Sequence, residues 1–242
     1  MRAYNEEQTI TAIKNELANI ENLYNSNCVN WTGKTSDTNE PYSEVIANVL
    51  LRNLNLFDSI QPITRTSTYC RENHCKVEMD ICKSNRQEEI FAKRLTGLTL
   101  DELGYVIDYQ VPLKDTRADK GAGKIDLISF NEEAKTLYLI ELKYKHNTEA
   151  LLRASLESYT YFKLVKIDKL LADYKNVIEK IFGFADIGNV KAKPAVLLVP
   201  PCKANDELED IDMNIRPQQK ALALALGIKY FTLDLSVYET EL

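Results

Sequence analysis

The sequence predicts an α/β fold with a mixed central sheet, a core of order αβββαβ and extra N-terminal helices. Residues 105–111 alternate between apolar and polar side chains, as a half-buried strand does. Residues 124–130 and 136–143 are two further β runs, and the polar segment 131–135 between them is typical of a hairpin turn. After a long helical pattern, residues 195–199 form a short apolar run of the kind that is buried on both faces.

Two amphipathic helices are expected before this core. In residues 5–24 apolar side chains recur at steps of three and four, as on one face of a helix. A second helix is expected through residues 45–54, with Ser43 as its N-cap. We therefore expect residues 1–84 to form a helical elaboration and residues 85–242 to form the α/β domain.

The other elements of the core follow from the same two patterns of apolar residues, alternation in strands and steps of three and four in helices. A helix that carries Phe91 and Leu95 is expected before the first strand, with Ser84 or Asn85 as its cap. Further elements are helices at 148–164, 170–181 and 218–226, and a last strand at 230–235.

Composition and charge limit the possible classes of protein. Of the 242 residues 45% are hydrophobic and 27% are charged, which argues against disordered, fibrous and membrane proteins. The net charge of −6 gives no global positive field, so contact with nucleic acid requires a local basic patch. The loop 114–124 is either that patch or a solvated turn, and its basic residues are Lys114, Arg117, Lys120 and Lys124.

The first residues and the cysteines predict the compartment. Residues 1–7 lack the apolar core of a secretion signal, and no apolar stretch approaches the ~20 residues that a membrane span needs. We expect a cytoplasmic protein without disulfides. Cys70, His74, Cys75 and Cys82 offer a possible zinc set, but their gaps lack the close pairs of zinc ribbons, so buried free thiols are favoured.

The most informative polar residues lie in the predicted hairpin. Glu141 and Lys143 share one strand face after an apolar run, and a turn centred on residues 133–134 brings Asp126 directly opposite Glu141. Two carboxylates this close repel each other unless a proton or a cation lies between them. Oxygen ligands favour Mg²⁺ or Mn²⁺, whose bound waters attack phosphorus centres. Lys143 is placed to orient that water or to neutralise charge on the phosphate.

A third carboxylate is expected from the helix before the sheet. Glu88 lies in the middle of the arc formed by Phe91, Ala92 and Leu95, so it is expected to face the interior and to share the metal. The alternative is an exposed glutamate in the first turn, where the helix dipole favours negative charge. For the hairpin residues, the alternative is a simple charge network at a solvated sheet end.

Asp126, followed by Glu141-Leu142-Lys143 on a hairpin between helices, resembles the PD-(D/E)XK nuclease superfamily, whose core is restriction-endonuclease-like. The resemblance implies that Asp126 and Glu141 bind the metal, with help from the Leu142 carbonyl and Glu88. It also implies that Lys143 assists the nucleophile.

The resemblance covers about residues 85–199 and extends to the next helix. Members similar to the RecB nuclease branch carry Gln-x-x-x-Tyr there, and Glu157 to Tyr161 has this spacing with Glu in place of Gln. Ile125 stands where the family has Pro before the Asp. Candidate substrate-binding residues are Lys124, Arg153 and Tyr161.

The resemblance implies a magnesium-dependent nuclease, with DNA as the favoured substrate. The alternative from another class is a catalytically inactive module of the same fold, whose N-terminal helices are an interaction surface. A third interpretation is a defence or restriction component that needs a partner chain for activity.

Overall fold

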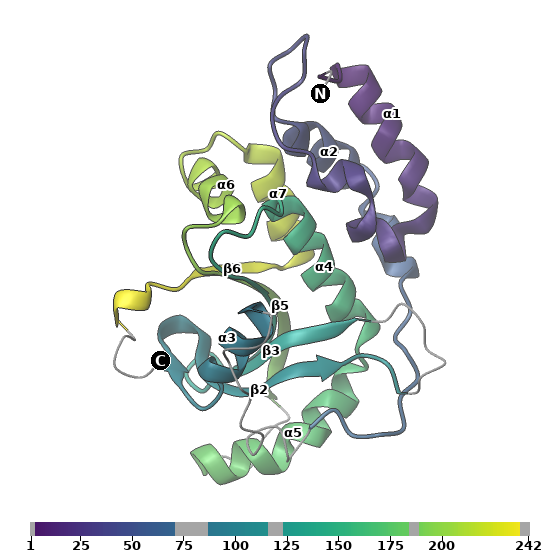
Figure 1. Ribbon diagram of the computed structural model, residues 1–242. Helices are drawn as coiled ribbons and strands as arrows, with labels where there is room; N and C mark the ends of the chain where they lie inside the picture. Colours follow the sequence, from purple (N-terminus) through teal and green to yellow (C-terminus); the bar gives the residue numbers. More distant parts are fainter. Residues whose placement is uncertain (1–2, 71–86, 116–122, 184–188, 238–242) are drawn as a thin grey trace.

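The computed structural model describes residues 3–70, 87–115, 123–183 and 189–237, and its centre is one six-stranded sheet (Figure 1). The strands lie across the sheet in chain order. Neighbours from β1 to β4 are antiparallel, whereas β4, β5 and β6 are parallel, which confirms an α/β protein with a mixed sheet. The strands are β1 (Thr99–Leu100), β2 (Gly104–Pro112), β3 (Lys124–Asn131), β4 (Thr136–Lys143), β5 (Lys191–Leu198) and β6 (Lys229–Thr232).

The hairpin of β3 and β4 has the predicted register. Five consecutive pairs run from Asn131 and Thr136 at the turn to Leu127 and Ile140, where the ladder ends. All eight residues of β4 are buried, because β3 and β5 flank it and helices cover its faces. The polar side chains at the end of this strand are therefore held in the interior.

One face of the sheet is covered by α3 (Gln87–Leu95). Phe91 and Leu95 of this helix belong to a hydrophobic core with Leu127 and Ile140 of the hairpin, which we call the α3-side core. The apolar spacing of α3 explains its packing, since these side chains lie on one stripe of the helix.

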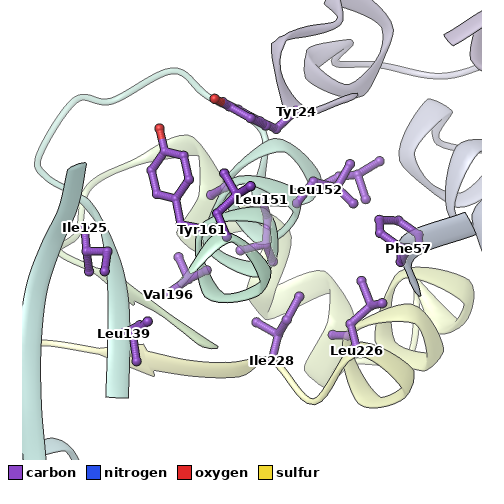
Figure 2. Close-up of a cluster of buried hydrophobic side chains, with 14 of the residues drawn as sticks. Tyr24, Phe57, Ile125, Leu139, Leu151, Leu152, Tyr161, Val196, Leu226 and Ile228 are labelled. Carbon is purple, nitrogen blue, oxygen red and sulfur yellow. The ribbon is translucent and has the colours of Figure 1, made fainter. Parts of the chain in front are cut away.

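The opposite face is covered by α4 (Leu151–Leu164) and α5 (Ile167–Phe182), which confirm the two helices expected there. The hydrophobic core on this face, which we call the α4-side core, contains residues of the sheet, α4 and α5. Figure 2 shows part of it, where Ile125 and Leu139 from the sheet lie near Tyr161 of α4. With α3, the three strands β2 to β4, α4 and β5, the predicted order αβββαβ is observed.

The first expected helix is shorter than predicted. α1 (Glu6–Glu16) is followed by the 3₁₀ segment η1 (Leu17–Asn25), and Asn19 breaks the helical geometry with φ −118° and ψ 53°. The Asn19 side chain accepts a hydrogen bond from the Asn22 amide. Such local side-chain bonds compete with the hydrogen bonds of a helical backbone. The α-helix therefore ends although the apolar spacing of the sequence continues past it.

The predicted cap of the second helix is wrong. α2 (Tyr42–Leu51) begins directly after Pro41, so Ser43 lies inside the first turn. Its hydroxyl instead accepts a hydrogen bond from the Arg216 guanidinium. The helix also ends before Leu54, which begins the 3₁₀ segment η3 (Leu54–Ser59).

The N-terminal helices extend the α4-side core. Ile13, Leu23, Ile46 and Phe57 are buried in this core together with residues of α4 and of α7 (Pro217–Leu226). The helical stripes that the sequence shows therefore pack against the α/β core. Figure 1 shows α2 next to α7, with α1 on the outer side of α2.

The C-terminal part contains one helix that the sequence analysis missed. α6 (Lys203–Asp212) is rich in acidic residues and buries only Ala204, Glu207 and Ile211, so it gives a weak apolar period. The expected last strand ends early, at Thr232 in β6. In the ranges that the structure describes, no helix combines the length and the apolar character of a membrane span.

Candidate active site

Asp126 lies where the regular alternation of β3 is interrupted. Ile125 and Ile128 both belong to the α4-side core although they are three residues apart, whereas Leu127 belongs to the α3-side core. In a regular strand the side chains alternate at every residue. The regular ladder ends at Leu127 and Ile140, so Asp126 does not pair directly with Glu141 as predicted. Its carboxylate instead accepts a hydrogen bond from the backbone N–H of the next residue, Leu142.

The Asp126 carboxylate is held by two N–H donors. Its Oδ1 accepts a hydrogen bond of 2.8 Å from the Gln110 amide, and its Oδ2 accepts one of 2.9 Å from the Leu142 backbone N–H. Burial raises the pKa of Asp126 to about 7, and the negative charge of Glu88 acts in the same direction. The Leu142 N–H and the charge of Lys143 oppose this rise in pKa.

Glu141 and Lys143 form a buried ion pair beside Asp126. The distance from Lys143 Nζ to Glu141 Oε1 is 2.8 Å, and the two residues are only 4% and 6% exposed. Burial raises the pKa of Glu141, and the negative charge of Asp126 raises it further. The two carboxylates therefore lie close enough to repel each other.

The Lys143 ammonium contacts two more carboxylates, one just before α4 and one in the middle of it. It pairs with Glu149, and Glu157 Oε2 lies 3.7 Å away. Burial alone would lower the pKa of Lys143, but the charges of Glu141, Glu157 and Glu149 raise it well above its ordinary value. We call Asp126, Glu141, Glu149, Glu157 and Lys143 the hairpin cluster.

Arg153 and Tyr161 join the cluster through these glutamates. Arg153 Nε lies 3.3 Å from Glu149 Oε1, and the Tyr161 hydroxyl donates a hydrogen bond of 2.9 Å to Glu157 Oε1. Tyr161 is buried, and burial raises its pKa. Both side chains thus support the cluster from inside α4, whereas Lys124 is exposed at the first position of β3.

Gly123 makes room for the Tyr161 hydroxyl next to the cluster. A Cβ atom at this position would lie 2.1 Å from the Tyr161 Oη, well inside van der Waals contact. Any larger residue here would therefore displace the Tyr161 ring from its place beside the chain before β3.

Glu88 binds the loop that follows β4. Its Oε1 accepts hydrogen bonds from the Tyr144 backbone N–H at 3.1 Å and from the Asn147 amide at 2.7 Å. The side chain is half-buried, so it is neither the buried ligand nor the exposed first-turn residue of the two sequence interpretations. Its charge still raises the pKa of Asp126.

An open pocket adjoins Asp126 and Glu88. It has a volume of about 500 Å³ and lies between the start of α3 and the loop after β4. The lining residues include Gln87, Gln110, Tyr144, Lys145, His146 and Asn147. A ligand in this pocket would reach Asp126 from solvent, while Glu141 and Lys143 lie behind it in the interior.

The residues fit a metal in their chemistry but are not arranged as a ready ligand set. Within the described ranges, no three acidic, histidine or cysteine side chains converge in a metal-binding arrangement. Glu141 is paired with Lys143, and Glu88 is bonded to the loop after β4. The donors are nevertheless all oxygen atoms, and the four carboxylates outnumber the two cationic side chains beside them, Lys143 and Arg153, which is an excess of acidic groups that a hard cation would neutralise.

Gln110 and Glu149 are cluster contacts that the sequence analysis missed. Gln110 is the only amide side chain in β2, where Asp108 is the only charged one, and this is a usable signal. Glu149 begins a series at steps of four residues with Arg153, Glu157 and Tyr161, and such a series lies on one side of a helix.

Some of the predicted residues lie outside the described part of the chain. Cys70 is described, and Cys28 and Cys202 are buried thiols whose pKa values burial raises. The predicted residues that lie outside the described ranges are His74, Cys75, Cys82, Ser84, Asn85, Arg117 and Lys120.

Comparison with known proteins adds no relative. No family model, curated protein or solved structure matches the chain.

Proposed function

We propose that the protein is a metal-dependent nuclease of the PD-(D/E)XK type, which hydrolyses phosphodiester bonds with DNA as the favoured substrate. The observation that carries this proposal is the meeting of Asp126, Glu141 and Lys143 at one end of the hairpin, beside an open pocket. Clustered titratable groups with strongly shifted pKa values are typical of functional sites.

Asp126 and Glu141 would hold the cation, with the Leu142 carbonyl and Glu88 as further oxygen donors. Bound Mg²⁺ or Mn²⁺ supplies a Lewis acid for the phosphate and lowers the pKa of a bound water. The Leu142 N–H and the Gln110 amide orient the Asp126 carboxylate.

Lys143 acts as a donor in this proposal. The surrounding carboxylates raise its pKa well above the ordinary value, so it stays protonated at neutral pH. An ammonium group has three donors and no acceptor, and so Lys143 cannot take a proton from water. It would instead stabilise negative charge that grows on the phosphate.

The test is cleavage of labelled single-stranded and duplex DNA, with RNA in a parallel series. We expect cleavage in Mg²⁺ or Mn²⁺ that chelator abolishes, and a loss of about 10²-fold or more in Asp126→Asn and Glu141→Gln. Glu133→Gln is the matched control, because it changes an exposed acid at the other end of the same hairpin. Wild-type activity that survives in Asp126→Asn would refute the assignment.

A catalytically inactive module of the same fold is the second candidate. It is favoured by the Lys143 ammonium, which already contacts three carboxylates of the cluster. This candidate predicts no metal-dependent cleavage of any nucleic acid by the intact wild-type protein. It also predicts that Asp126→Asn and Glu133→Gln behave alike in every cleavage assay.

A further inference from the structure

Gln110 has an unusual backbone near the end of β2. Its φ is +49°, in the left-handed region, although the flanking pairs Tyr109 with Leu127 and Val111 with Ile125 keep a regular register. A residue other than glycine is uncommon there and persists only where its surroundings hold it. Such outliers cluster at functional sites, which makes the contacts of Gln110 informative.

The strained residue marks a change of face in both strands. Tyr109 belongs to the α3-side core and Val111 to the α4-side core, although residues two apart normally share a face. Their partners Leu127 and Ile125 change face in the same way. The change thus occurs at Gln110 and at the facing Asp126, and both side chains line the open pocket.

Gln110 completes a two-point clamp on Asp126. Its Nε2 donates to Oδ1 over 2.8 Å, while the Leu142 N–H donates to Oδ2 over 2.9 Å. The donors come from the strands on either side of β3, so together they fix the plane of the carboxylate. Each carboxylate oxygen has two lone pairs, and the clamp leaves one on each for a further ligand.

We infer that Gln110 is a positioning residue that orients Asp126 for a divalent cation. The inference rests on the proposed function, since it assumes that Asp126 binds the metal. Groups that hydrogen-bond a metal-binding carboxylate fix its orientation, and their loss typically weakens metal affinity by about 10–100-fold. Gln110 touches neither substrate nor metal in this scheme.

The experiment measures Mn²⁺ affinity of the full chain by calorimetry, with thermal unfolding alongside. Gln110→Met keeps the length of the side chain but removes the donor, and we expect it to weaken Mn²⁺ binding by about 10–100-fold. Gln110→Gly also removes the donor but suits the left-handed backbone. We therefore expect Gln110→Gly to keep or raise the Tm and still to lose Mn²⁺ affinity.

A matched control comes from outside the pocket. Gln61→Met changes an exposed glutamine that does not line the pocket and should leave Mn²⁺ affinity unchanged. A purely structural role predicts the opposite pattern, with a lower Tm in Gln110→Met, recovery in Gln110→Gly and wild-type affinity in both. With saturating Mg²⁺, DNA cleavage by Gln110→Met should recover toward the wild-type rate, because the defect lies in cation affinity.

Failure of this inference can be told apart from failure of the proposed function. If Asp126→Asn weakens Mn²⁺ binding and neither Gln110 variant does, the positioning role is refuted and the metal site stands. If the wild type binds no Mn²⁺, or if Asp126→Asn binds it as the wild type does, both are refuted.

Discussion

Two buried groups of charged residues in the described part of the chain are built differently. One is the hairpin cluster, and the other, which we call the helix-cap network, joins α2, α6 and α7. Its members are Ser43, Glu44, Glu207, Asp210 and Arg216.

In the helix-cap network each buried glutamate accepts backbone N–H groups at the start of a helix. Glu44 accepts from Gln218 and Gln219 in the first turn of α7, at 2.8 Å each, and Glu207 accepts from Leu151 at the start of α4. Negative charge is favourable at a helix N-terminus. Burial raises the pKa values of Glu44 and Glu207, and these N–H groups act against the rise.

In the hairpin cluster the carboxylates meet one another instead of helix ends. Three of them contact the ammonium of Lys143, and the fourth, Asp126, opens on a pocket. The same residue types therefore cap helices in one place and gather more carboxylates than cationic groups in the other. This difference in partners, more than burial itself, marks the hairpin cluster as the candidate site.

The largest expected effect comes from removing the Lys143 ammonium group. Lys143→Met leaves Glu141 buried without a counter-charge, and the free energy of unfolding at pH 7 should fall by about 3–5 kcal/mol. Acidification should restore part of this loss, because protonation removes the buried charge. Urea denaturation at pH 7 and pH 5 measures both effects.

The control for this variant is an exposed lysine in a similar ion pair. Lys175 pairs with Glu179 on the surface of α5, so Lys175→Met should change the free energy of unfolding by less than about 1 kcal/mol. Equal effects of the two substitutions would show that the hairpin cluster is no more than a surface network.

The pH dependence of stability should separate Asp126 from the other acids. Burial raises its folded pKa to about 7 from an ordinary value of 3.8, so the folded state binds more protons between these values. The free energy of unfolding contributed by Asp126 therefore falls as pH rises from about 4 to 7, by roughly 2–4 kcal/mol. Urea titrations of wild type and Asp126→Asn should differ by this slope, and Mn²⁺ should reduce it in the wild type. Parallel pH profiles would contradict this prediction.

A smaller effect is expected in the helix-cap network. Glu44→Ala leaves two N–H groups at the start of α7 without their acceptor, which should cost about 2 kcal/mol in the free energy of unfolding. Mn²⁺ affinity should stay at the wild-type value, because the network is separate from the pocket. A parallel loss of Mn²⁺ affinity would show that the two groups are coupled.

The fold was predictable where apolar side chains alternate or recur without interruption. The register of β3 and β4 follows from the turn and the pattern on both strands, and α4 and α5 follow from their apolar stripes. α6 escaped prediction because its buried face includes Glu207, a charged residue that the N-terminus of α4 stabilises.

The site was predictable in its members but not in its geometry. The pattern located Asp126, Glu141 and Lys143, yet regular alternation could not foresee the change of face at Gln110 and Asp126. That change depends on a left-handed residue, which the side-chain pattern does not reveal. The partners of Lys143 from α4 likewise depend on how that helix lies over the sheet.

The smallest predicted effect concerns the Tyr161 hydroxyl, a candidate substrate contact that the structure bonds to Glu157. Tyr161→Phe removes one buried hydrogen bond and should lower the free energy of unfolding by about 1 kcal/mol. Tyr159→Phe, on the same helix, is the matched control and should change it by less than about 0.5 kcal/mol. The hydroxyl is bonded to Glu157 and Tyr161 does not line the open pocket, so DNA affinity should not change in Tyr161→Phe. Wild-type stability combined with weaker DNA binding would instead assign this hydroxyl to the substrate.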